Sequence, residues 1–216
     1  MLKKLYYKYK TKDPYQDIND YYNMIFIHIP KNAGISIEEA LFEKKVGHKT
    51  IRQFQAHDAK RFEKYWKFTI VRNPYDRLVS AFHFLKKGGL HEIDKAWADS
   101  NIGHIDTFKE FVFLLKDKSF EYNITKWQHF RQQSFYLKNF KNEIDIDYIA
   151  KFENLSEEFD YIKNQLSLKD QILQHKNKSS RNHWSEYYDD KEMLEIVYRI
   201  YEEDFSNFGY KRGTNE

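Results

Sequence analysis

The chain has 216 residues, no cysteine, and 36 basic residues against 33 acidic ones. The missing cysteine excludes disulfide bonds, thiolate metal sites and a cysteine nucleophile. The nearly balanced charge argues against a nucleic-acid partner, although it leaves room for a local basic pocket. No apolar run approaches the ~20 residues of a membrane helix, so we expect a cytoplasmic protein without a transmembrane segment.

Residues 1–22 are rich in lysine and tyrosine and lack the apolar core of a secretory signal. We expect them to form an N-terminal leader or arm of a single domain that spans residues 1–216. Two interpretations stay open for this segment: a disordered or loosely docked leader, or an arm that binds a surface or a partner.

The first predicted strand is residues 24–29 (MIFIHI), a short apolar run of the kind found in buried parallel strands. Pro30 and a turn through Gly34 end it. From Ser36 onward the apolar residues have helical spacing, which predicts a strand, a loop and a helix in that order.

The same succession recurs from residue 67. Residues 67–72 (KFTIVR) predict a second buried strand, Asn73 can cap the helix that follows, and Pro74 suits its first turn. Four apolar side chains then give this helix an inward-facing stripe: Tyr75, Leu78, Val79 and Phe82.

Further elements follow downstream. Capping-box patterns at 107–110 and 154–157 predict two helix starts. We also predict a helix over 127–137, a third strand over 144–152, and a last helix over 186–206 with Gly209 just beyond it.

Strands that alternate with helices predict an α/β fold, P-loop-like, with three layers and a mainly parallel central sheet flanked by helices. In such folds ligands bind beyond the carboxyl ends of the strands. The two motifs described next both lie at such ends.

The first motif is residues 30–36 (PKNAGIS), where a strand ends, the chain turns and a helix begins. Free backbone N–H groups and the helix dipole at that point favour an anion. Lys31 adds a positive charge and Ser36 a hydroxyl donor. The loop resembles a P-loop but lacks the Gly-Lys-Ser/Thr ending that nucleoside-triphosphate enzymes use.

The second motif is residues 71–82 (VRNPYDRLVSAF). Arg72 ends a strand, and Ser80 follows eight residues later, a little over two helical turns on. A guanidinium fork and a hydroxyl that converge on one point suit a phosphate. Two anion sites at neighbouring strand ends indicate a ligand with two separated anionic groups.

Residues 28–36 (HIPKNAGIS) followed by residues 71–82 resemble the paired signatures of sulfotransferases that use 3′-phosphoadenosine 5′-phosphosulfate (PAPS). The likeness is to the carbohydrate-type branch, with its heparan and chondroitin sulfotransferases, and to its short bacterial-type members. It continues through residues 147–155, 175–180 and 201–210, and so covers about residues 24–211.

The resemblance implies a role for each matching residue. Lys31 would contact the 5′-phosphosulfate and stabilise charge on the leaving phosphate. Arg72 and Ser80 would hold the 3′-phosphate, and residues 176–180 would close over the nucleotide through Lys176 or Ser179. The donors of the loop would come from five residues: Asn32, Ala33, Gly34, Ile35 and Ser36. At Asn32 and Ile35 the relatives usually carry Thr or Ser, so a hydroxyl is lost at Ile35 while the backbone donors remain.

His57 resembles the histidine that many bacterial relatives carry between the two signatures. The acceptor hydroxyl must lose a proton as it attacks sulfur, and an imidazole can take that proton near neutral pH. Three carboxylates are alternative bases: Asp58, Glu38 and Glu39.

Two further features have both a structural and a functional interpretation. His28, inside the first strand, fits a satisfied core histidine better than a cleft residue. A stripe at helical spacing could line an acceptor groove, but such stripes more often belong to a core: Trp127, Phe130, Gln133 and Tyr136.

The resemblance therefore implies transfer of a sulfuryl group from PAPS, without a metal, to a hydroxyl on a glycan or glycolipid. One alternative is a P-loop-type small-molecule kinase, which the missing Lys-Ser/Thr pair disfavours. Another is a non-catalytic glycan-binding or partner-binding module on the same fold.

Overall fold

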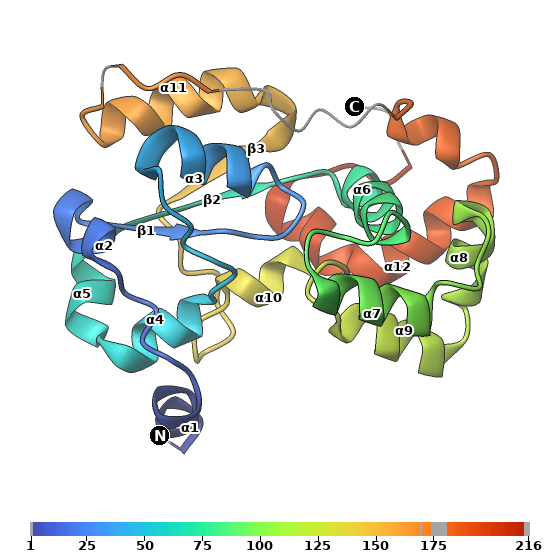
Figure 1. Cartoon of the computed structure of the whole chain (residues 1–216), viewed down its shortest axis with the longest axis horizontal. Helices are drawn as coiled ribbons and strands as arrows, with labels where there is room; N and C mark the ends of the chain where they lie inside the picture. The colour runs from blue at the N-terminus through green and yellow to red at the C-terminus, as the bar shows by residue number, and fades with distance from the viewer. Residues whose placement is uncertain (1, 169, 174–180, 214–216) are drawn as a thin grey trace. The chain divides into compact units, whose positions relative to one another are not determined.

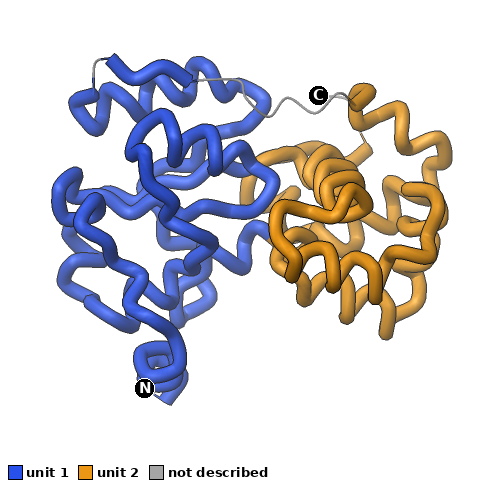
Figure 2. Tube along the Cα trace, viewed as in Figure 1, with its two compact units in different colours: residues 1–71, 133–179 blue, residues 72–132, 180–216 orange. Residues whose placement is uncertain are grey.

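The computed structural model describes residues 2–168, 170–173 and 181–213. The chain forms two compact units (Figure 2). Unit 1 comprises residues 1–71 and 133–179, and unit 2 comprises residues 72–132 and 180–216.

Unit 1 contains a three-stranded parallel sheet in the order β1-β2-β3. The strands are β1 (Met24–Ile27), β2 (Trp66–Val71) and β3 (Tyr148–Lys151). Phe26 pairs with Phe68, which in turn pairs with Tyr148. The third strand is shorter than predicted, because Ile144 forms only an isolated antiparallel bridge with Lys138.

Helices cover both faces of this sheet, with α3 and α11 on one side and α4 and α5 on the other (Figure 1). Phe26 and Phe68 stack face to face at 4.8 Å and pack with Ile37 of α3 and Phe159 of α11. On the opposite face, the ammonium group of Lys67 lies over the ring of Phe62 in α5. The α/β, P-loop-like fold with a parallel sheet between helices is thus confirmed. The helices of unit 1 are α1 (Leu2–Lys10), α2 (Asp17–Tyr22), α3 (Gly34–Phe42), α4 (Ile51–His57), α5 (Ala59–Lys64), α10 (Gln133–Leu137), the 3-10 helix η1 (Phe152–Asn154) and α11 (Leu155–Gln165).

The predicted leader contains two helices, α1 and α2. At the start of α2, the Asn19 side chain accepts a hydrogen bond from the backbone N–H of Gln16, the N-cap residue. Asn19 is buried and donates from Nδ2 to the carbonyl of Met24, the first residue of β1. Tyr15 donates its hydroxyl to the carbonyl of Asp58. The second half of the leader is therefore bonded to the sheet and to the α4–α5 turn.

Unit 2 is helical among the residues that the structure describes. As predicted, Asn73 caps the first helix through its side chain and Pro74 is that helix's first residue. Tyr75, Leu78, Val79 and Phe82 are all buried in the core of this unit. Gly209 ends the last helix with φ +65°, in the left-handed region where glycine is favoured. The elements of unit 2 are α6 (Pro74–Lys86), α7 (Glu92–Asn101), α8 (Phe108–Leu114), α9 (Lys118–Lys126), the 3-10 helix η2 (Trp184–Tyr187) and α12 (Lys191–Phe208).

Two predicted helices differ from the structure in their bounds. The helix over 127–137 is wrong, because only Gln133–Leu137 is helical, as α10. The last helix begins later than predicted, at Lys191, with Asp190 as its cap. The helix start predicted at 154–157 is confirmed, because Asn154 is the N-cap residue of α11, although its side chain makes no cap bond.

Among the described helices, none has the length and apolar character needed to cross a membrane. In the same residues, no three His, Asp or Glu side chains gather closely enough to hold a metal ion.

Candidate active site

The loop between β1 and α3 has an unusual backbone. Lys31 and Ala33 have φ values of 74° and 60°, in the left-handed region, whereas Asn32 between them does not. This conformation is strained for a side chain other than glycine, at roughly 1–3 kcal/mol for each residue. Alternation of this kind turns successive N–H groups toward one side and forms a concave site for an anion.

The first turn of α3 leaves its backbone donors unused. Ala33 is the N-cap residue and contributes no side-chain bond, and the first helical hydrogen bond runs from Ile37 N–H to the Ala33 carbonyl. The N–H groups of Gly34, Ile35 and Ser36 have no acceptor among the described residues, and neither has the hydroxyl of Ser36. The predicted donors are thus together at one helix start, where the dipole also favours an anion.

Asn32 has a structural role that its sequence position did not reveal. Its side chain is 1% exposed and donates from Nδ2 to the Ile70 carbonyl and to Oε1 of Gln133, both at 2.7 Å. The side chain therefore ties the loop to β2 and to α10. Oδ1 of Asn32 is buried without a hydrogen-bond partner in the described part of the chain.

Gly34 is required because His28 occupies the adjacent space. A Cβ atom on Gly34 would lie 2.0 Å from Cδ2 of His28, a distance that no side chain tolerates. His28 is 4% exposed and is bonded through Nδ1 to Oε1 of Glu38, 2.8 Å away on α3. Its interpretation as a satisfied buried histidine is supported, and the structure adds that the ring packs directly against the loop.

Glu38 accepts three hydrogen bonds at one oxygen, from His28 and from the backbone N–H groups of Val46 and Gly47. Burial alone would raise the pKa of Glu38. The bonds from His28 and from the two amides outweigh burial and hold the pKa of Glu38 below its usual value. The carboxylate thus fastens β1, α3 and residues 46–47 to one another.

His57 is the last residue of α4 and is half-buried. Its Nε2 lies 3.1 Å from the hydroxyl oxygen of Thr11, and that hydroxyl donates its proton to the Tyr7 carbonyl. Toward His57 the oxygen of Thr11 acts as an acceptor, which places the proton of the neutral ring on Nε2. Nδ1 of His57 is then the basic atom, and it has no hydrogen-bond partner among the described residues.

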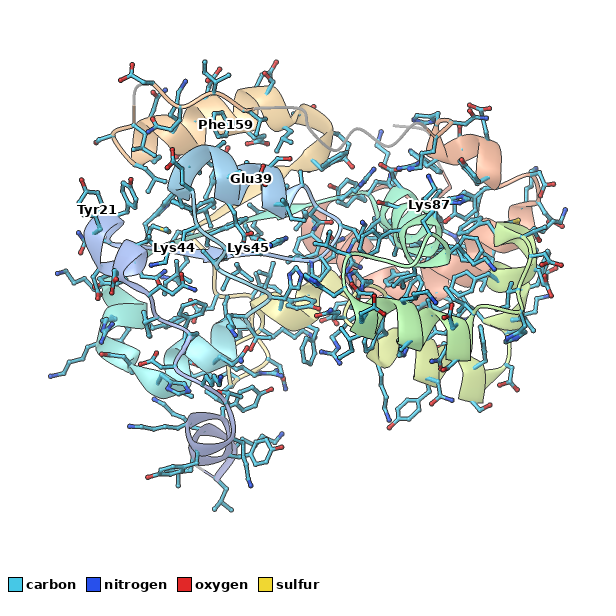
Figure 3. All side chains as sticks on the ribbon, viewed as in Figure 1. Tyr21, Glu39, Lys44, Lys45, Lys87 and Phe159 are labelled. Carbon is cyan, nitrogen blue, oxygen red and sulfur yellow. The ribbon has the colours of Figure 1, made fainter. Side chains whose placement is uncertain are left out.

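Two of the alternative bases have structural tasks. Asp58 caps α5 by accepting from the N–H of Arg61 and also binds the Arg61 guanidinium at 3.0 Å. The backbone bond from Arg61 and then its side chain hold the pKa of Asp58 below its usual value. Glu38 is buried and bonded as described above. Glu39 is exposed on α3 (Figure 3).

The loop and His57 are connected through α10. Helix α4, which ends at His57, packs against α10. Gln133, the first residue of α10, accepts the bond from Asn32 of the loop and is fully buried. Helix α10 thus contacts both the loop that contains the predicted anion donors and the helix that ends at the predicted base.

In unit 2, Arg72 and a second arginine share one buried carboxylate. Nε and Nη2 of Arg72 both lie 2.7 Å from Oδ2 of Asp76, and Nη2 of Arg181 binds Oδ1 of the same group. Arg72 and Asp76 are 8% and 9% exposed. Arg181 belongs to neither of the two sequence motifs and was not predicted, and its Nε is buried without a partner in the described residues.

Ser80 lies one turn beyond Asp76 on α6, so the two share a helix face. Its hydroxyl has no hydrogen-bond partner in the described chain. His83 follows on the same face. Burial, and then the charges of Arg181 and Lys87, lower the pKa of His83 below its usual value. This face of α6 is therefore electropositive and has an unused donor.

The remaining predicted residues divide into two groups. Ser179 and Lys176 lie outside the described residues. Of the aromatic stripe, Phe130 and Tyr136 are buried, and Trp127 stacks on Trp97 at 4.8 Å. These residues therefore belong to packed cores, as the structural interpretation predicted.

Comparison with known proteins identifies one similar protein. The chain is similar to carbohydrate sulfotransferase 12 of Xenopus laevis, with 23% identity over 253 aligned positions that cover 90% of this chain and 60% of that protein. The chain thus spans less than two thirds of this relative's length. No solved structure matches the chain.

The family comparison is broader. The model of the family described as "Sulfotransferase family" matches residues 15–211, which include the loop at Lys31, His57, and Arg72 with Ser80. On this evidence the chain belongs to the sulfotransferase family.

Proposed function

We propose that this protein transfers a sulfuryl group from PAPS to a hydroxyl of a carbohydrate acceptor. The observation that carries the proposal is the β1–α3 loop, where three N–H groups at the start of α3 have no acceptor in the described part of the chain and lie beside two residues in the left-handed region. Family membership supports the reaction class. The name of the relative supports a glycan acceptor.

We assign the 5′-phosphosulfate to this loop. The N–H groups of Gly34, Ile35 and Ser36 would donate to its oxygens, and the ammonium group of Lys31 would offset the negative charge that grows on the leaving phosphate. Donors that are fixed before the reaction stabilise developing charge without the cost of reorganisation. The strained backbone and the buried bonds of Asn32 and His28 support this role because they hold the loop in place.

We assign the 3′-phosphate to Arg72 and Ser80, and extend the set to Arg181. The Nε atom of Arg181 and the hydroxyl of Ser80 have no partner within the described residues, and Arg72 is the residue directly after Val71, the last of β2. Arginine forks match the geometry of a phosphate and are always charged. A carboxylate already bridges the two arginines, so the phosphate would bind beside Asp76.

The proposed reaction is a direct in-line displacement. A bond forms between the acceptor oxygen and sulfur while the bond from sulfur to the bridging phosphate oxygen breaks. The acceptor proton passes to Nδ1 of His57, and adenosine 3′,5′-bisphosphate leaves. The bond between Nε2 and Thr11 supports this role, because it orients the ring and keeps Nδ1 unprotonated in the neutral state.

Two measurements test the proposal. In thermal-shift titrations, adenosine 3′,5′-bisphosphate should stabilise the protein and Mg-ATP should not; the reverse would indicate a small-molecule kinase. Incubation with radiolabelled PAPS and a panel of glycans, lipids and phenols should then label a glycan. Glycan binding without any nucleotide binding or label transfer would instead indicate a non-catalytic module.

A further inference from the structure

Helix α1 exposes an apolar stripe. Leu2, Leu5, Tyr6 and Tyr9 are 83%, 42%, 63% and 78% exposed. Their spacing of three and four residues places them on one helix face, which we call the outer stripe. Leucine side chains normally bury most of their surface, so a helix with two exposed leucines and two exposed tyrosines on one face has a surface that water does not favour.

The opposite side of α1 is the one that contacts the rest of unit 1. Because each residue of an α-helix is rotated by 100° from the one before, Tyr7 points roughly away from the outer stripe. Its ring meets the ring of Phe140 edge-on at 5.6 Å. The helix contacts α4, and Thr11 just after it bonds to His57. The outer stripe therefore faces away from unit 1, at whose edge α1 lies (Figure 1).

Lysines flank the outer stripe on both sides. Lys3 and Lys10 lie along one side and Lys8 along the other, whereas Lys4 lies on the opposite face of the helix; all four are exposed. Residues 2–10 include no acidic side chain. An apolar stripe of leucine and tyrosine with lysines on both sides is the pattern of helices that lie in the plane of a membrane interface, with their lysines at the lipid phosphates.

The positive charge of α1 favours an anionic lipid surface over a second copy of this chain as the partner of the outer stripe. A second copy that packed its own α1 there in a two-fold arrangement would bring six flanking lysines together with no carboxylate from either helix. An anionic lipid surface offers negative charge beside every flanking lysine and an apolar layer beneath the stripe. The helix is only ~14 Å long, under half of a bilayer core, so it can lie on a membrane but cannot cross one.

We propose that α1 is an in-plane anchor through which the protein binds reversibly to an anionic membrane surface. The inference rests on residues 2–10 and their contacts and is independent of the sulfotransferase reaction. The test uses the full chain and sucrose-loaded vesicles, either of phosphatidylcholine alone or of phosphatidylcholine mixed with phosphatidylserine, in a sedimentation assay. The protein should sediment with the mixed vesicles, stay largely in solution with phosphatidylcholine alone, and dissociate at high salt.

Two double variants test the lysines and the apolar residues of α1 separately. Each lysine near an anionic surface strengthens binding roughly fivefold, so the double change Lys3→Gln and Lys8→Gln should weaken binding to the mixed vesicles about thirtyfold. Leu5→Ser with Tyr9→Ser should weaken it as well. The matched control is Lys60→Gln with Lys64→Gln, two exposed lysines of α5, which should leave binding unchanged.

Two results would overturn the inference. One is binding that does not depend on phosphatidylserine or that the α1 lysine variant retains in full. The other is a wild-type protein that does not bind the vesicles but forms a concentration-dependent dimer, which the double change Leu5→Ser with Tyr9→Ser dissociates. This result would assign the outer stripe to a second copy. The substituted side chains are exposed, so each variant should keep the wild-type thermal unfolding temperature.

Discussion

The hydroxyl oxygen of Thr11 lies 3.1 Å from Nε2 of His57, across 46 residues of sequence, and its proton is donated to the carbonyl of Tyr7. This bond joins the segment that follows α1 to the proposed base. It also determines which ring nitrogen carries the proton. Thr11 is thus a positioning residue for His57, and it does not itself contact the reacting atoms.

Thr11→Val tests this relationship, because valine keeps the shape of threonine but loses its hydroxyl. We expect turnover to fall about fivefold, the equivalent of one ordinary hydrogen bond, with an unchanged KM for PAPS. Steady-state kinetics measure both. In a His57→Ala background the same change should have no further effect on turnover. An equal loss in both backgrounds would show that Thr11 acts through the fold and not through His57.

Measurements of nucleotide binding and of turnover should distinguish the role of Lys31 from that of His57. Lys31→Ala should lower turnover roughly a hundredfold or more, because developing charge on the leaving phosphate loses its neutralising partner. His57→Ala should lower turnover by a similar factor while its affinity for adenosine 3′,5′-bisphosphate stays that of wild type. Isothermal titration and steady-state assays check the pair. Normal turnover by His57→Ala would return the role of base to a carboxylate, with Glu39 the one that is exposed.

Asp76→Asn should show whether the two arginines in unit 2 bind a phosphate. The free variant should lose about 3 kcal/mol of unfolding free energy, because two largely buried guanidinium groups lose their shared carboxylate. A bound 3′-phosphate would supply the missing negative charge. Adenosine 3′,5′-bisphosphate should therefore raise the unfolding temperature of Asp76→Asn more than that of the wild type.

The control for this experiment is adenosine 5′-phosphate, which lacks the 3′-phosphate and should give no extra stabilisation of Asp76→Asn. If both proteins gained the same stability from the bisphosphate, Arg72 and Arg181 would have no part in binding the 3′-phosphate.

Glu38→Gln should destabilise the protein by about 3 kcal/mol at neutral pH, because a buried charged partner of His28 is lost. The pKa of Glu38 lies below its usual value of 4.5 in the folded protein. Its stabilising effect is therefore complete above that usual value and declines as the pH falls through the lower folded value. The difference in unfolding free energy between wild type and variant should be constant from pH ~7 to ~5 and shrink in more acid solution.

Urea denaturation at a series of pH values measures this difference. Glu39→Gln, at the adjacent exposed position, should change the unfolding free energy by less than about 0.5 kcal/mol. A Glu38→Gln deficit that stayed constant down to strongly acid pH would contradict the role of the Glu38 charge.

The sequence predicted the elements whose signal is local. A continuous apolar run, a turn with glycine and then helical spacing are enough to identify β1, the loop and α3, and Asn73 with Pro74 located the start of α6. In each case the residues that specify the element are adjacent in the chain, so no distant contact is needed to infer it.

Predictions failed where distant residues decide the local structure. The carbonyls of Phe130 and Arg131, which a helix over 127–137 would have used, instead accept bonds from the side chains of Tyr201 and Arg77. These partners cannot be read from local sequence patterns.

The same limit applies to the candidate site. Lys31, Gly34 and Arg72 were identified from the spacing of their motifs. The contact of Asn32 with Gln133 spans 101 residues, and the contact of Asp76 with Arg181 spans 105. No periodicity or motif connects such pairs, so the buried groups that support the site appear only in three dimensions.

The close packing of Gly34 against the ring of His28 means that these two positions cannot vary independently. A methyl group at 34 becomes tolerable only when the side chain at 28 is cut back to leave a space of matching size. Any homologue that replaces this glycine with alanine should therefore have given up the imidazole at the end of its first strand, and a designer who wants a bulkier turn must redesign the strand residue first.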